Sequence, residues 1–132
     1  MIAPKIALGC ALLVAGLGVA AGGTDAMPYK VQGNKVDAAT LAGWKTWRSL
    51  ACDRCHGKEQ QGEGPAGPSL NAGLKSMTKE EFKEVVLKGR IAKGMPNFDG
   101  SKAVTDNIDG LYAYLKGRSD GAIPPGRLEP LP

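Results

Sequence analysis

The apolar residues of this chain form one uninterrupted run near the N-terminus and three amphipathic stretches further along. The first amphipathic stretch follows Asp37, whose side chain can cap a helix that opens at position 38. Leu41, Trp44 and Trp47 then recur at helical spacing. The pattern predicts a helix over residues 38–51, which leads directly into a stretch that contains two cysteines.

A second helix is predicted from a stronger start signal. Thr78 and Glu81 have the spacing of a capping box, and Met77 can pack as a staple onto Phe82. Apolar residues then lie on one side of the pattern until Gly89, where we expect the helix to end.

The third predicted helix lies near the C-terminus. We expect it to be capped near Thr105 or Asp106, with Leu111 and Leu115 on its apolar face and an end at about residues 117–118. Three helices of ordinary length therefore account for most of the periodic sequence.

The remaining segments carry turn and loop residues. A short hairpin is predicted around the Gly33-Asn34 turn, which two valines flank. Residues 57–76 and 90–104 are rich in Gly and Pro and are expected to form long irregular loops. The proline-rich tail, residues 119–132, is expected to lie extended on the surface.

The N-terminal apolar run has the layout of a secretory signal peptide. A lysine precedes it, residues 6–21 carry no charge, and small residues end it, so we expect residues 1–26 to be removed after Ala26 or Ala21. A retained N-terminal anchor is the alternative. Either way, residues 27–132 form a single domain, and the signal predicts a periplasmic location.

Composition limits what this domain can build. Of its 106 residues, 22 are Gly or Pro, so it is loop-rich and short of core-forming side chains. Small domains with thin cores usually need a staple or a cofactor, and a large apolar cofactor would supply the missing core. The net charge of +4 is modest and gives little support to nucleic-acid binding.

The stretch "CDRCH" places Cys52, Cys55 and the chain's one histidine, His56, together. A zinc site would need about four ligands, usually from two clusters, and the chain has no second cluster. A thioredoxin-like redox pair favours a βαβ neighbourhood, which the helix-and-loop pattern lacks. Covalent haem attachment accounts for each residue, with two thioether bonds from the cysteines and His56 as an axial iron ligand.

A methionine is the natural second axial ligand, because no other histidine exists. Met27 lies at the predicted new N-terminus, and Met77 is explained by its staple role. Met95 lies in a loop, between Gly94 and Pro96, where no helix needs it. We therefore predict Met95 as the sixth ligand. With both axial positions filled, the iron has no open site, which favours an electron carrier over an enzyme.

The order of an N-terminal helix, "CDRCH", "GPSL", "GMPNF" and a closing aromatic helix resembles class I cytochrome c over about residues 37–118. The resemblance implies an all-α fold, with about three main helices and long loops wrapped around one covalent haem c. It also implies that the carbonyl of Pro68 accepts a hydrogen bond from His56 and that Leu70 presses on the haem.

The resemblance further implies that Gly43 and Trp47 meet the last helix at Leu111, Tyr112 and Leu115. One feature departs from the family. Its helical aromatic usually precedes the first haem cysteine by four residues, whereas here the tryptophan precedes it by five. A one-residue bulge in the helix would account for the difference.

The two ends of the domain, "YKVQGNKVDAATLAGW" and "IDGLYAYLKGRSDGAIPPGR", resemble small periplasmic cytochromes that accept electrons from PQQ-dependent methanol and ethanol dehydrogenases. This implies a monomeric electron carrier with a PQQ-dependent alcohol dehydrogenase as donor and an oxidase or second cytochrome as acceptor. Two alternatives are a membrane-tethered or subunit cytochrome, favoured if residues 6–21 are kept, and a peroxidase-like haem enzyme.

Overall fold

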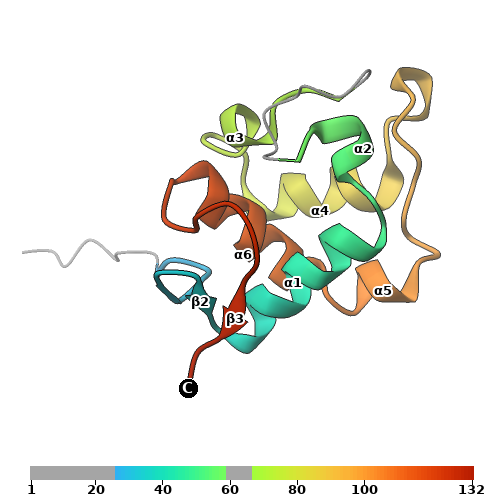
Figure 1. Cartoon of the computed structure of the whole chain (residues 1–132). Helices are drawn as coiled ribbons and strands as arrows, with labels where there is room; N and C mark the ends of the chain where they lie inside the picture. The colour runs from blue at the N-terminus through green and yellow to red at the C-terminus, as the bar shows by residue number, and fades with distance from the viewer. Residues whose placement is uncertain (1–25, 59–66) are drawn as a thin grey trace, which may run out of the picture.

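The computed structural model describes residues 26–58 and 67–132. The predicted signal peptide, its cleavage sites and the alternative anchor therefore lie outside the described residues, apart from Ala26. Figure 1 shows helices α1 and α6 crossing at the centre, with α2, α3 and α4 grouped on one side. The elements are, in chain order, β1 Val31–Gln32, β2 Lys35–Val36, α1 Ala38–Ser49, α2 Asp53–His56, α3 Leu70–Gly73, α4 Lys79–Lys88, the 3-10 helix η1 Ile91–Lys93, α5 Lys102–Thr105, α6 Ile108–Ser119 and β3 Glu129–Pro130.

The two predicted helix starts with strong local signals are confirmed. Asp37 caps α1, accepting a hydrogen bond from the backbone N–H of Thr40 at 3.0 Å. Thr78 and Glu81 form the reciprocal capping box of α4, which ends at Gly89. In both cases the cap and its backbone partner lie within three residues, so the signal depends on local sequence alone.

The third helix begins close to the predicted position, but neither Thr105 nor Asp106 caps it. The helix α6 begins at Ile108 after Asn107, whose side chain makes no capping hydrogen bond. Asp106 instead closes the separate short helix α5, and its carboxylate pairs with Lys102 at 2.6 Å. The Asp106 carboxylate, which suggested a helix cap, thus forms an ion pair with a lysine four residues earlier.

Helices α1 and α6 approach closely because two glycines meet at their crossing. A Cβ atom on Gly43 would overlap the carbonyl of Gly110, and one on Gly110 would overlap the carbonyl oxygen of Ala39. The expected meeting of Gly43 with Leu111 is present at the backbone. The ring of Trp47 also lies beside Tyr114 of α6, which was not among its predicted partners, with ring centroids 6.3 Å apart.

Helix α4 packs against α6 through the rings of Phe82 and Tyr112, whose centroids are 5.4 Å apart. At the edge of this contact, Asp109 of α6 pairs with Lys83 at 2.6 Å and with Lys79 at 3.0 Å. Hydrogen bonds from Lys83 and Lys79 hold the pKa of the Asp109 carboxyl below its usual value. The three main helices thus form one packed unit.

The predicted hairpin is confirmed, because Val31 of β1 pairs with Val36 of the antiparallel strand β2. The prediction that the tail lies on the surface is wrong in part, because Ile123 and Leu128 are fully or almost fully buried. The tail is extended, as expected, but β3 pairs in parallel with β2. Val36, Ile123 and Leu128 belong to one buried cluster, so the tail is part of the core.

The described fold is mostly helical, with this small sheet at one end. No helix within residues 26–58 and 67–132 is long and apolar enough to cross a membrane.

Candidate functional site

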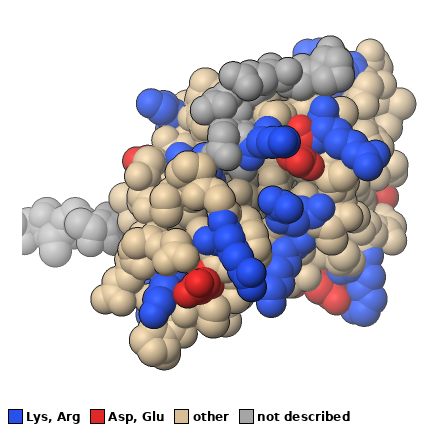
Figure 2. Space-filling view, viewed as in Figure 1, with Lys and Arg blue, Asp and Glu red and all other residues tan. Residues whose placement is uncertain are grey.

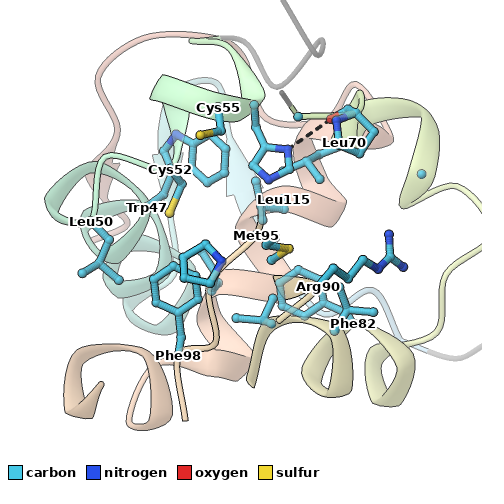
Figure 3. Close-up of a pocket in the computed structure, with 18 of the residues that line it drawn as sticks. Trp47, Leu50, Cys52, Cys55, Leu70, Phe82, Arg90, Met95, Phe98 and Leu115 are labelled. Atoms are coloured by element: carbon cyan, nitrogen blue, oxygen red, sulfur yellow. Dashed lines mark hydrogen bonds between the residues drawn. The ribbon is translucent and has the colours of Figure 1, made fainter. Parts of the chain in front are cut away.

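A cavity of about 850 Å³ lies between the end of α1, helices α2, α3 and α4, and the loop after α4. Its walls are mostly apolar, as the side chains in Figure 3 show. Trp47, Leu74 and Phe82 are among the buried residues that line it. A volume of this size suits a cofactor, since such sites span roughly 300–1,000 Å³. The composition predicted few core-forming side chains. The cavity explains this shortage, because the apolar side chains surround it and do not fill it.

The first cysteine is positioned by the way α1 ends. Ala51 adopts a left-handed conformation with φ 53°, and Cys52 N–H donates back to the carbonyl of Trp47 at 3.4 Å. A second hydrogen bond joins Ala51 N–H to the carbonyl of Arg48 at 3.3 Å. This pair of bonds is a Schellman turn, usually made with glycine. The extra residue between the tryptophan and the cysteine is accommodated here, after the helix, and not in a helical bulge.

The short helix α2 carries the second cysteine and the histidine. Its carbonyl at Cys55 and the ring of His56 lie against Gly67, where an added Cβ would come within 2.9 Å of Nδ1. Nδ1 of His56 lies 3.1 Å from the carbonyl oxygen of Pro68 and donates to it. This contact matches the one that the resemblance implied. It fixes the proton on Nδ1 and leaves the lone pair of Nε2 for a metal ion.

The two cysteines are free thiols that line the cavity. Burial, followed by the charges of Asp53 and Cys55, raises the pKa of the Cys52 thiol to about 11. Reactive redox cysteines have lowered pKa values, so the redox-pair interpretation is disfavoured. Among the residues described, no group of three or more His, Cys, Asp and Glu residues gathers as a metal site.

The Met95 side chain points into the cavity (Figure 3) from the loop that follows α4. Two hydrogen bonds fix its backbone to Arg90, with Arg90 N–H donating at 2.9 Å and Met95 N–H donating back at 3.2 Å. Gly94, left-handed with φ 81°, permits the turn between them. Met77 also lines the cavity, so position in the cavity lining does not by itself select one methionine as the ligand.

Leu70 lines the cavity from the start of α3, where the Ser69 side chain caps the helix. All six residues predicted for the site (Cys52, Cys55, His56, Pro68, Leu70 and Met95) therefore border one cavity. Two further residues were missed. These are Gly67, which had a signal in its place directly before Pro68, and Arg90, which had none.

The comparisons with known proteins agree with this geometry. Residues 38–115 match the family model described as "Cytochrome C oxidase, cbb3-type, subunit III". The chain is also 52% identical to cytochrome c-555 of Methylococcus capsulatus over 95 residues, which cover 71% of this chain and 74% of that protein. The chain belongs to the c-type cytochrome family.

Two other relatives extend this result. Cytochrome c-553I of Paracoccus denitrificans is 34% identical over 110 residues, covering 78% of this cytochrome and 48% of that protein. The crystal structure of the c-type cytochrome XoxG from Methylobacterium extorquens AM1 superposes with a TM-score of 0.69 at 30% identity. That match covers 77% of this cytochrome and 65% of the XoxG chain. The cytochrome thus spans less than two thirds of c-553I and of XoxG.

The fold is that of a class I cytochrome c, and the cofactor of the family is covalently bound haem c. The cavity fits this group on its own evidence. It offers an apolar space of suitable size, two thiols, an imidazole with a fixed tautomer and a thioether. Haem c supplies the redox-active iron, and the protein supplies its attachment, its axial ligands and its surroundings.

Proposed function

We propose that this cytochrome is a periplasmic monohaem electron carrier. It accepts single electrons from a PQQ-dependent alcohol dehydrogenase and passes them to a terminal oxidase or a second cytochrome. In this proposal Cys52 and Cys55 form the thioether bonds to haem c, and His56 and Met95 are the axial ligands. The working domain is residues 27–132, exported by a signal peptide over residues 1–26 and active as a monomer.

One observation carries the proposal: His56 and Met95 border the same cavity, each on a backbone held by hydrogen bonds. Haem iron with both axial positions filled by protein has no vacancy for oxygen, peroxide or substrate. Such a centre changes only its oxidation state. Electron transfer is therefore supported over enzymatic chemistry. In the same arrangement Pro68 orients His56, and Leu70 contacts the haem.

The choice of donor rests on the resemblance of the two ends of the domain to cytochromes that serve PQQ-dependent alcohol dehydrogenases. The structure joins these two ends, since the Tyr29 hydroxyl donates to Asp120 at 2.9 Å. The two segments therefore lie side by side in the folded domain. They contain Gly43 and Gly110, where helices α1 and α6 cross.

The charge of the molecule suits an acidic partner. The sequence carries a net charge of +4, and on the face shown in Figure 2 Lys and Arg outnumber Asp and Glu. Near the cavity, Arg54 and Lys75 are exposed, and among the residues described neither forms an ion pair. Lys88 contributes less, because it pairs with Glu84 at 2.8 Å. A weakly basic rim of this kind steers encounter and is screened by salt.

The direct test is stopped-flow reduction of the oxidised cytochrome by a purified PQQ-dependent alcohol dehydrogenase. We expect reduction to slow as salt rises. The double variant Arg54→Glu/Lys75→Glu should be slower than the wild type at low salt and equal to it at high salt. Lys30→Glu/Lys35→Glu, which makes the same change of net charge at two exposed positions in and beside the distant hairpin, is the control. Absence of reduction by the dehydrogenase, with normal reduction by ascorbate, would exclude this donor.

The family description gives a second candidate function. The matching model describes a subunit of an oxidase, and a retained leader would make this cytochrome a tethered component of such a complex. Membrane fractionation of the native protein, beside a recombinant chain that starts at Met27, separates the two functions. A peroxidase-like role makes a different demand, which is rapid binding of cyanide to the iron. We expect the ferric protein to bind cyanide slowly.

A further inference from the structure

The lining of the haem cavity contains very little charge. Among the described residues that border it, only Arg90 and Lys93 carry a permanent charge, and no Asp or Glu borders it. Neither cation forms an ion pair within residues 26–58 and 67–132. Both lie in or beside η1, on the loop that carries Met95. An apolar cavity thus presents two cations, from one segment, without an acidic partner among the residues that the structure describes.

Haem itself carries two acidic groups. Its two vinyl groups, which react with cysteines, lie on one side of the ring, and its two propionates lie on the opposite side. Figure 3 shows the guanidinium end of Arg90 on the side of the cavity away from Cys52 and Cys55. Attachment at the two cysteines therefore directs the propionates toward the side where Arg90 lies.

We propose that Arg90 binds a propionate carboxylate of haem c, with Lys93 supplying a second positive charge at the same end of the cavity. A carboxylate beside apolar walls is costly unless a cation and hydrogen bonds compensate for its lost hydration. A guanidinium does this well because its planar fork can donate two parallel hydrogen bonds to one carboxylate. The assignment rests on the haem c of the family and is independent of the electron donor.

The backbone holds this cation in a fixed relation to the proposed axial ligand. Arg90 and Met95 exchange two hydrogen bonds, and the preceding Gly89 packs so closely on Pro96 that an added Cβ would lie 2.6 Å from its carbonyl carbon. The propionate partner and the thioether therefore belong to one tight turn. A positive charge in this position favours the reduced haem, which carries one positive charge less than the oxidised form.

The test is the reduction potential of the purified holoprotein, measured by spectroelectrochemistry at fixed pH and ionic strength. We expect Arg90→Gln to shift the potential to a more negative value. Arg90→Lys, which keeps the positive charge, should have a potential close to that of the wild type. Lys88→Gln is the matched control, because this exposed lysine lies two residues earlier and does not border the cavity. Its potential should equal that of the wild type.

The far-red thioether band should persist in Arg90→Gln, which shows that Met95 is still bound. An unchanged potential in Arg90→Gln, or an equal shift in Lys88→Gln, would overturn the assignment. If Arg90→Gln does not accumulate with haem, the test is instead a comparison of infrared redox-difference spectra between the wild type and Arg90→Lys. The carboxylate bands should shift when the guanidinium is replaced by an ammonium group, and identical bands would overturn the assignment. None of these measurements requires a dehydrogenase, so their failure is distinct from failure of the proposed function.

Discussion

Gly43 of α1 and Gly110 of α6 face each other so closely that neither position has room for a side chain. Each lies against backbone atoms of the opposite helix, which cannot rotate away as the end of a flexible side chain can. The crossing of the two helices is thus set by the absence of two Cβ atoms.

Gly43→Ala should therefore force the helices apart. We expect a loss of unfolding free energy on the order of 3 kcal/mol, the upper end for overpacking, measured by denaturant unfolding of the holoprotein. Gly100→Ala is the matched control, since an added Cβ there meets nothing within 4 Å and the residue does not border the cavity. Its stability should be unchanged or slightly higher. Equal effects of the two substitutions would contradict the close approach at the crossing.

Met95→Ala should abolish the thioether-to-ferric charge-transfer band in the far red. The Met95 side chain comes from a loop whose backbone is hydrogen-bonded to Arg90. It has no packing role on the face of a helix. Met77→Ala should keep the band but lower stability by about 2 kcal/mol, the low end for such truncations, because Met77 is partly buried. The oxidised spectrum of each variant decides between them. Loss of the band in Met77→Ala instead would assign the sixth ligand to Met77.

Replacing both Cys52 and Cys55 with alanine should leave a chain that cannot retain haem. Because the cavity of about 850 Å³ is lined mainly by apolar side chains, an empty protein would lose their packing. We expect little helix in far-ultraviolet circular dichroism and no cooperative thermal transition. A well-folded apoprotein with a sharp transition would show that the core is complete without haem.

The C-terminal tail should contribute strongly to stability through Ile123. This side chain is fully buried against Gly117 and the ring of Tyr29 lies nearby. Ile123→Ala should cost about 2–5 kcal/mol, measured by thermal or denaturant unfolding. Ile91→Ala removes the same atoms from a side chain that is 66% exposed, and should change stability by no more than about 0.5 kcal/mol. Similar costs at the two positions would mean that the tail is not docked in solution.

Alkaline pH should weaken the attachment of the N-terminal segment to α6. Burial, followed by the hydrogen bond to Asp120 and its negative charge, raises the pKa of Tyr29 to about 12. The folded protein therefore holds this proton more tightly than the unfolded chain, whose tyrosine titrates near 10. The stabilisation is complete below pH 10 and is lost between about pH 10 and 12.

Tyr29→Phe provides the comparison for this pH dependence. At neutral pH it should be less stable than the wild type by about 1 kcal/mol, the usual net value of one hydrogen bond. The difference should shrink or reverse by pH 12, since phenylalanine does not titrate. Unfolding curves at pH 8, 10 and 12 check this. A constant difference across the range would show that the pKa of Tyr29 is the same in the folded and unfolded protein.

Local signals in the sequence were sufficient for the elements whose start depends on neighbouring residues. Asp37 and Thr78 cap their helices through contacts within three residues. The cap of α6 was mispredicted because Asp106 is paired with Lys102, a choice that the capping pattern alone does not reveal. The tail was mispredicted because it packs near Tyr29 and pairs with β2, both more than ninety residues earlier in the chain.

The candidate site was predictable where chemistry dictates residue type. Two thiols, an imidazole and a thioether are uncommon enough to be recognised from "CDRCH" and "GMPNF". Gly67 and Arg90 were not recognised, because glycine and arginine are common in loops. Their roles depend on atoms that only the folded chain brings near, the ring of His56 for one and the cavity for the other.

The parallel pairing of β3 with β2 brings the two ends of the domain to the same side of the molecule. Figure 1 shows the C-terminus beside this small sheet, at the opposite end from α2 and α3, which border the cavity. A surface, a second domain or an electrode could therefore be joined to either end without covering the haem cavity. The cytochrome can in this way be immobilised by one terminus while the other stays available and the redox centre faces outward.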